Sequence, residues 1–243
     1  MSKSPTNNPA SFPLHPAATL WLLDGDRIDD SRLVSLKAQL GSDERLRYQR
    51  FLRPQRAREF LLGRMLLRHA ACYLLGPAAA DIGVAEREHQ APAVSFPAFA
   101  ATPDFHFSIS HSRGWIACLA STVCAVGLDI ENKAHVRDVE ELSAAAFDDA
   151  QRQWLAGVDT QHPTQRFYRL WNNQEALYKL RDNLAEEVDA ASCGIGWNCF
   201  NADHPHLHIG VCAAQELASF DIVELPDLGP DQYLQDIQFP RGK

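Results

Sequence analysis

Two acidic residues, Asp129 and Glu131, stand two positions apart in a short stretch that alternates apolar and other residues. On an extended strand their side chains share one face, with their bases roughly 6.5–7 Å apart. Carboxylates at that spacing can converge on one hard cation such as Mg²⁺, which is typically held by one or two carboxylates plus substrate phosphates. The pair predicts a metal site for phosphate chemistry, with the solvated face of an edge strand as the alternative.

A second group lies on a helix that we expect over residues 164–180. Trp171, Glu175 and Lys179 recur every fourth residue and therefore lie along one face of that helix. A glutamate four residues before a lysine is also the favourable order for an ordinary surface ion pair. The spacing alone leaves both interpretations open.

Two further segments could bind an anion. Residues 110–114 (SHSRG) follow a predicted strand, where a polar turn can direct hydroxyl, imidazole and N–H groups at a ligand. Residues 43–68 hold eight arginines against three acids, and guanidinium groups match phosphate oxygens in a bidentate way. A solvated helix face is the alternative for this segment. The arginines are Arg45, Arg47, Arg50, Arg53, Arg56, Arg58, Arg64 and Arg68.

Composition excludes several classes of protein. The formal net charge of −8 over 243 residues disfavours general nucleic-acid binding. No run approaches the roughly 20 apolar residues of a membrane span, and the first residues lack a secretory signal, so we expect a cytoplasmic protein without a membrane partner. The cysteines form no C-x-x-C pair, which favours buried free thiols over a zinc site or disulfides. They are Cys72, Cys118, Cys124, Cys193, Cys199 and Cys212.

The elements that must position these residues are both strands and helices, so the predicted fold class is α+β. The proline-rich residues 1–17 read as a flexible N-terminal lead-in, and residues 91–103 as an irregular connection. Apolar runs and alternating patterns predict strands at 19–23, 105–110, 115–121, 124–130, 206–213 and 220–224. Helical spacing predicts helices at 31–40, 54–75, 136–147, 148–155 and 164–180.

Taken in order, three blocks resemble the surfactin-type (Sfp-like) 4′-phosphopantetheinyl transferases. Residues 107–112 (FSISHS) resemble the N/S-I-S-H-S block of that family, and residues 126–131 (VGLDIE) resemble its V/I-G-I/L-D-I-E strand. Residues 167–179 (FYRLWNNQEALYK) resemble its W-x-x-K-E-A/S-x-x-K helix. Residues 60–68 are similar to its upstream helix, so the resemblance spans residues 45–180.

This resemblance implies a monomer of two pseudo-symmetric α+β halves, residues 18–121 and 122–243, each a small antiparallel sheet packed with helices. Coenzyme A would bind in the cleft between the halves, a common place for ligands. The implied activity is transfer of the 4′-phosphopantetheine group of coenzyme A to a serine of an apo carrier protein (acyl, polyketide or peptidyl). The second product would be 3′,5′-ADP, and Mg²⁺ would be the cofactor.

The resemblance also implies a role for each acidic residue. Asp129, Glu131 and Glu175 would ligate magnesium on the diphosphate. Glu175 would in addition serve as the general base that takes the proton of the attacking serine. Lys179 would bind coenzyme A and stabilise the charge that develops on the leaving nucleotide.

The implied phosphate contacts come from the first half of the chain. Ser110 and His111 would contact the nucleotide phosphates, and Arg53 and Arg58 would meet the 3′-phosphate. Two departures stand out, since Gln174 replaces a lysine of the family and residues 90–92 (QAP) replace its G-K/R-P loop. Both departures indicate weaker affinity for coenzyme A with activity retained.

Other functions compete with this one. A catalytically impaired relative that still binds coenzyme A would keep the same fold and lose the transfer step. An unrelated metal-dependent phosphoesterase or nucleic-acid module would use the same carboxylates without a carrier protein.

Overall fold

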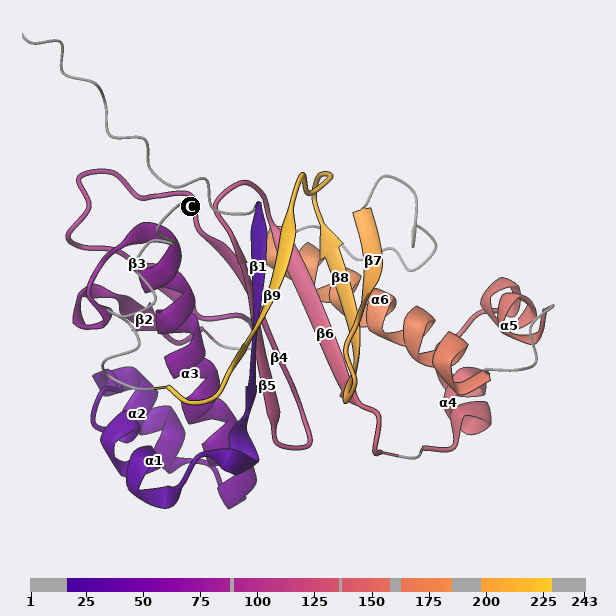
Figure 1. Cartoon of the computed structure of the whole chain (residues 1–243), viewed down its shortest axis with the longest axis horizontal. Coiled ribbons are helices and arrows are strands. Elements are labelled where there is room, and N and C mark those ends of the chain that lie inside the picture. The colour runs from indigo at the N-terminus through magenta and orange to yellow at the C-terminus, as the bar shows by residue number, and fades with distance from the viewer. Residues whose placement is uncertain (1–16, 88–89, 136, 158–162, 185–197, 229–243) are drawn as a thin grey trace, which may run out of the picture.

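The computed structural model describes residues 17–87, 90–135, 137–157, 163–184 and 198–228. The expected lead-in lies outside these ranges except for Ala17, and so does Cys193. The α+β fold class is confirmed, because helices pack on small and mostly antiparallel sheets (Figure 1). No helix in the described ranges is long and apolar enough to cross a membrane.

Two larger sheets form the centre of the molecule. The first has the strand order β4-β5-β1-β9, and the second has the order β6-β8-β7. β9 runs parallel to β1, so a strand from late in the chain completes the first sheet. The first sheet consists of β1 (Ala18–Asp24), β4 (His106–Ser112), β5 (Trp115–Ser121) and β9 (Phe220–Leu225). The second consists of β6 (Val126–Asn132), β7 (Asn198–Asp203) and β8 (Leu207–Ala213).

Most of the predicted helices are confirmed, with shifted ends. The helix expected at 54–75 has those ends in the structure, since Pro54 opens it and Gly76 follows it in the left-handed conformation, with φ 78°. The helix expected at 31–40 ends earlier, at Lys37. The helices are α1 (Asp30–Lys37), α2 (Ser42–Gln49), α3 (Pro54–Leu75), α4 (Val139–Ala146), α5 (Asp149–Ala156) and α6 (Pro163–Leu184).

Some elements were not predicted. α2 has the sequence SDERLRYQ, whose few apolar residues give no helical period. The expectation of an irregular connection over 91–103 is wrong in part, because β3 (Ala93–Ser95) pairs there with β2 (Gly83–Ala85). Three-residue strands are too short to show an alternating pattern.

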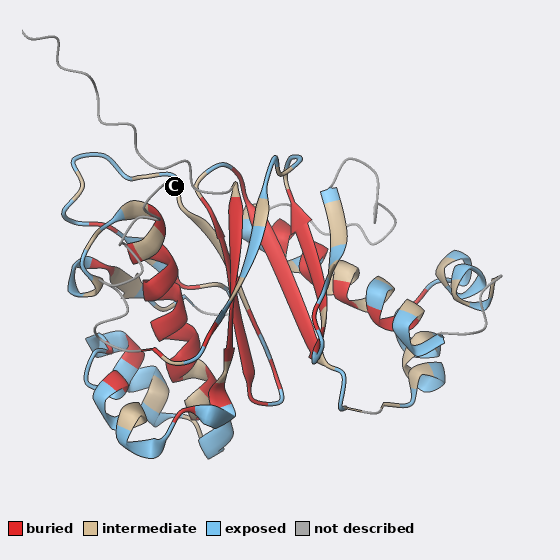
Figure 2. Cartoon of the chain, in the orientation of Figure 1, coloured by how far each residue is buried: buried red, intermediate tan, exposed pale blue. Residues whose placement is uncertain are grey.

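The layers follow the order α3, first sheet, second sheet, α6 (Figure 1). Alternation along β1 divides the core, because Trp21 and Leu23 pack toward α3 while Leu20 and Leu22 pack toward the second sheet. Buried residues therefore fill α3 and the central strands, whereas α4 and α5 are largely exposed (Figure 2).

Two glycines let α6 approach the second sheet closely. A Cβ on Gly127 would lie 2.0 Å from the carbonyl oxygen of Ala176, and one on Gly210 would lie 2.5 Å from the backbone of Asn172. No larger residue fits at either place without moving the helix. This close approach carries the acidic and basic side chains of α6 toward β6.

The cysteines differ in part from the expectation of free thiols. Cys199 on β7 and Cys212 on β8 are cross-strand partners with Cα atoms 4.1 Å apart, and they form a disulfide. The expectation of free thiols is wrong for this pair. The pairing of β7 with β8 brings together two cysteines that are 13 residues apart in the chain, and a search for C-x-x-C motifs cannot detect such a pair. Cys72, Cys118 and Cys124 are free and buried as expected, and burial raises the pKa of the Cys72 thiol to about 11.

A buried ion pair ties α2 to α3. Arg68 donates from both terminal nitrogens to Glu44, at 2.9 and 2.6 Å, and neither side chain is exposed by more than 5%. Arg68→Met would leave the Glu44 carboxylate buried without its main partner, so we expect a loss of about 3–5 kcal/mol in the free energy of unfolding. Urea titration measures it, with the exposed Arg53→Met as control. Equal midpoints for the two variants would contradict this role.

Candidate active site between the two halves

Asp129 and Glu131 lie on the face of β6 that α6 covers. As predicted, Val126, Leu128 and Ile130 occupy the opposite face and fill the core between the sheets. The two acidic residues are exposed by only 7% and 9%. Buried carboxylates need partners, and these define the site.

Lys179 of α6 is the main partner of Asp129. Its ammonium nitrogen lies 2.8 Å from Asp129 Oδ1 and 3.0 Å from the carbonyl oxygen of Leu128. It also donates to the hydroxyl of Ser110 at 3.1 Å. The side chain therefore points into the space between the helix and β6, so the alternative of an ordinary surface pair with Glu175 does not describe it.

Glu175 stands half-buried one helical turn before Lys179. Burial raises the pKa of its carboxyl group above the usual range, and the negative charges of Asp129 and Glu131 add to that effect. Lys179 opposes it. The charges of Asp129 and Glu131 therefore both act on the Glu175 carboxyl group.

The raised pKa of Glu175 has a consequence for stability. The folded chain holds this proton more tightly than the unfolded chain, so the cost of the buried carboxylate grows as pH rises through the raised pKa. Without divalent metal, Glu175→Gln is expected to melt at a higher temperature than the wild type above that pKa, and the difference should vanish at acidic pH. Thermal unfolding in chelator across pH measures it. A difference independent of pH would contradict this cause.

Glu131 is held from two sides. Its Oε1 accepts from Arg137 at 2.9 Å, and its Oε2 accepts from the hydroxyl of Ser112 at 2.7 Å. A carboxylate oxygen has two acceptor positions, so these bonds orient Glu131 and still leave room for a cation.

One carboxylate oxygen of the cluster lacks a hydrogen-bond partner, and this oxygen fits a divalent cation. Asp129 Oδ2 is buried and has no hydrogen-bond partner among the described residues. A cation beside it would satisfy that oxygen and offset the repulsion felt by Glu175. In the conformation described here, no three His, Cys, Asp or Glu side chains of the described ranges already form a ligand group. Among the acidic residues of the cluster, Asp129 therefore has a buried oxygen that fits a cation.

Ser110 and His111, which were predicted to contact phosphates, differ in how far they are exposed. Ser110 is buried, and its hydroxyl is engaged by Asp129 and Lys179. The His111 side chain is 40% exposed, with Nδ1 3.1 Å from Arg56 Nη1 and 3.5 Å from Glu59 Oε2. Burial lowers the pKa of His111, and Glu59 opposes this. His111 is therefore accessible to a ligand, whereas Ser110 is part of the scaffold.

The two arginines singled out for the 3′-phosphate have different surroundings. Arg58 is committed to the fold, because it donates to the carbonyl oxygens of Gly25 and Ile28. Arg53 is exposed and directly precedes α3.

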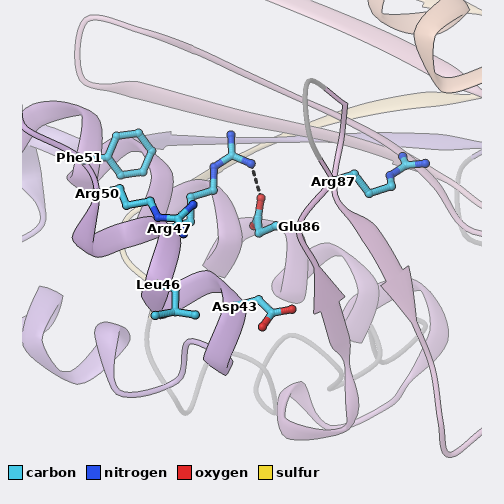
Figure 3. A pocket seen from close by; sticks show the side chains of 7 residues that line it. All are labelled: Asp43, Leu46, Arg47, Arg50, Phe51, Glu86 and Arg87. Atoms are coloured by element: carbon cyan, nitrogen blue, oxygen red, sulfur yellow. Dashed lines mark hydrogen bonds and ion pairs between the residues drawn. The ribbon is translucent and has the colours of Figure 1, made fainter.

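An arginine-lined cavity of about 760 Å³ opens between α2 and the segment after β2. Figure 3 shows Arg50 and Phe51 on one side of it and Arg87 on the other, with Arg47 paired to Glu86 between them. Its lining holds three guanidinium groups against the carboxylates of Asp43 and Glu86, so the net charge of the lining is positive. Together with the ring of Phe51, this lining suits an anionic ligand with a planar part.

A smaller cavity of about 240 Å³ connects this region with α6. Arg47 and the 90–92 loop line it from the first half, and Lys179, Asp182 and Asn183 line it from the second. Arg47 borders both cavities, so a long ligand could run from the arginines to Lys179. Arg47 and Arg50 belong to the arginine-rich segment, but the selected Arg53 and Arg58 do not line the larger cavity. No signal in the sequence distinguished Arg47 from its neighbours or marked Arg87.

Together, these features define a class of protein: two α+β halves with a carboxylate–lysine cluster at their seam, beside cavities suited to a phosphate-bearing ligand. Two family models match adjacent parts of the chain. Residues 29–124 match "4′-phosphopantetheinyl transferase, N-terminal", and residues 125–220 match "4′-phosphopantetheinyl transferase superfamily". The chain belongs to the 4′-phosphopantetheinyl transferase superfamily, as the motifs predicted.

Curated relatives bear the same name at modest identity. A 4′-phosphopantetheinyl transferase of Bacillus subtilis is 31% identical over 59% of this chain and 61% of its own length. The transferase HetI of Nostoc sp. is 29% identical over 71% of this chain and 73% of its own. AcpT of Escherichia coli is 30% identical over 50% and 58%. The chain thus spans less than two thirds of the Bacillus and Escherichia relatives.

Proposed function

We propose that this protein transfers the 4′-phosphopantetheine group of coenzyme A to a serine of an apo carrier protein and releases 3′,5′-ADP. The observation that carries the proposal is the cluster of Asp129, Glu131, Glu175 and Lys179, because its Lys179 lines the smaller cavity together with Arg47. The names of the relatives support the same reaction. The protein would be a cytoplasmic monomer with halves 18–121 and 122–243 and no nucleic-acid or membrane partner. The second half contributes β9 to the sheet of the first.

The acidic residues would hold Mg²⁺, with Asp129 as anchor and Glu131 and Glu175 as the other ligands. When bound, the ion would supply positive charge to the diphosphate oxygens of coenzyme A. The buried, orphaned oxygen of Asp129 supports this assignment. Ser112 and Arg137 hold Glu131 in place.

Glu175 would act as the general base. Its half-buried position beside the proposed metal site leaves its carboxylate open to the approaching serine. The serine oxygen forms a bond to the β-phosphorus as the bond from that phosphorus to the bridging oxygen breaks. The serine proton passes to Glu175, and the electron pair leaves with 3′,5′-ADP. Lys179 would stabilise the charge on the diphosphate oxygens.

The nucleotide end of coenzyme A would occupy the arginine-lined cavity. His111 and Arg53 would contact the phosphates. Arg47 would contact them too, because it lines both cavities. Ser110 and Arg58 would support the site from within the fold.

Arg47→Ala is expected to raise the KM for coenzyme A by roughly 10- to 100-fold, the worth of one charge-assisted hydrogen bond, and to leave kcat nearly unchanged. Steady-state kinetics with saturating carrier protein measure both constants. Arg53→Ala provides the comparison, because sequence reasoning selected that residue. A larger effect at Arg53 than at Arg47 would move the nucleotide away from the cavity.

Intact mass of an apo carrier protein tests the function itself. Incubation with coenzyme A, Mg²⁺ and this protein should add one phosphopantetheine group to the carrier, and chelator should prevent it. Coenzyme A binding without mass gain on any of several carriers would favour the impaired relative. Release of phosphate or nucleotide without a carrier would favour the phosphoesterase.

A further inference from the structure

The second sheet has an outer strand, β6, whose free edge faces β4. The backbone N–H groups along this edge are not covered by another strand, because β8 pairs with β6 on the other side only. An uncovered edge in the interior would leave donors without partners. Serine hydroxyls of β4 provide the partners.

The three serines are every second residue of β4, and each is at most 7% exposed. Ser108 accepts from the N–H of Leu128 at 3.0 Å. Ser110 and Ser112 repeat this bond along the strand, to the N–H groups of Ile130 and Asn132, at 3.2 and 3.1 Å. The period of two residues on both strands keeps the bonds in register. We call this the serine seam (Ser108, Ser110 and Ser112).

Two members of the seam make a second bond. Ser110 donates its proton to Asp129 at 3.1 Å, and Ser112 donates its proton to Glu131 at 2.7 Å. The spacing is the same for all three serines. Each serine accepts a hydrogen bond from the backbone N–H of the residue twenty positions later in the chain, and it faces the residue nineteen positions later. At Ser108 that facing residue is Gly127, which has no side chain.

We infer that Ser112 is a positioning residue: through the serine seam it fixes the Glu131 carboxylate relative to the first half of the chain. The hydroxyl has a single proton, and the accepted backbone bond directs that proton at Glu131 rather than at water. Ser112 lies on β4, whereas Glu131 and Asn132 lie on β6, so both bonds of Ser112 join the two halves. The geometry of the acidic cluster therefore depends on how β4 lies against β6. The metal-related part of this inference rests on the proposed function.

Ser108 is a matched control within the same strand. Ser108 also lines the smaller cavity, but it makes no bond to a carboxylate among the described residues. Ser108→Ala therefore removes a backbone contact of the seam, whereas Ser112→Ala removes the equivalent contact and also the bond to Glu131. The difference between the two variants isolates the carboxylate bond. Removing a bond that orients a metal ligand typically costs 10- to 100-fold in metal affinity.

The test uses Mn²⁺ as probe, titrated into the metal-free full chain with coenzyme A present and followed by electron paramagnetic resonance. Ser112→Ala is expected to weaken Mn²⁺ binding 10- to 100-fold, Ser108→Ala to stay within about threefold of wild type, and Ser112→Thr to restore wild-type affinity. If Ser112→Ala does not fold, Ser112→Cys, a weak donor, replaces it under the same criterion.

Amide hydrogen exchange without metal gives a second readout. Ser112→Ala should speed exchange at Asn132 and leave Leu128 protected, and Ser108→Ala should do the reverse. Equal Mn²⁺ affinity for the two alanine variants overturns the positioning role while the proposed function stands. A wild-type chain that binds no Mn²⁺ overturns the metal-based function and that role together, and unchanged exchange at Asn132 overturns the seam itself.

Discussion

Glu175→Gln should lower kcat for transfer by about 10²- to 10⁴-fold, the usual worth of a general base. The amide is nearly the same size as the carboxylate, so α6 and its contacts with β6 are preserved. Glutamine cannot accept the serine proton, and it removes one negative charge from the cluster. Single-turnover kinetics with saturating coenzyme A and carrier measure the loss, because they separate chemistry from product release.

Binding of coenzyme A is the control for that variant. Calorimetry should find its affinity for Glu175→Gln close to wild type, since the proposed nucleotide contacts lie in the first half of the chain. Glu141→Gln, an exposed change on α4, should leave kcat unaltered. Wild-type turnover by Glu175→Gln would remove this residue from the mechanism.

Asp129→Asn is expected to reduce kcat/KM by at least about 100-fold, because it removes the anchor of the proposed cation site, where the ion stabilises charge by several kcal/mol. The change also leaves the Lys179 ammonium without its closest carboxylate, which lies 2.8 Å away in the wild type. Activity should no longer respond to added Mg²⁺ over the range that saturates the wild type.

Asp203→Asn serves as the matched substitution, since Asp203 is an exposed aspartate at the end of β7 in the same sheet. It should keep the wild-type response to Mg²⁺. An unchanged metal titration for Asp129→Asn would show that the D-x-E pair does not bind the ion.

Much of this fold follows from local signals in the sequence. Pro54 marks the start of α3 and Gly76 marks its end. The alternation along β6 separates its apolar face from Asp129 and Glu131. These features depend on conformational preferences of single residues and on burial of one face, so a sequence can reveal them.

The rest depends on contacts between distant segments. Arg47 and Arg58 come from one arginine-rich stretch, yet Arg58 is bound to backbone carbonyl oxygens and Arg47 lines a cavity. Strand pairing likewise decides that Cys199 and Cys212 meet. The Ser-x-Ser-x-Ser pattern of β4 was visible, but its role appears only when β6 lies beside it.

We expect Asp129, Glu131 and Glu175 to gather around one divalent ion between the halves. Crystals of the wild-type chain with coenzyme A and Mn²⁺ would test it through the anomalous signal of the metal. One peak is expected within about 2.0–2.3 Å of carboxylate oxygens of Asp129 and Glu175, with Glu131 at or beside the coordination shell. A metal peak on the diphosphate away from these side chains, in a crystal of active protein, would contradict it.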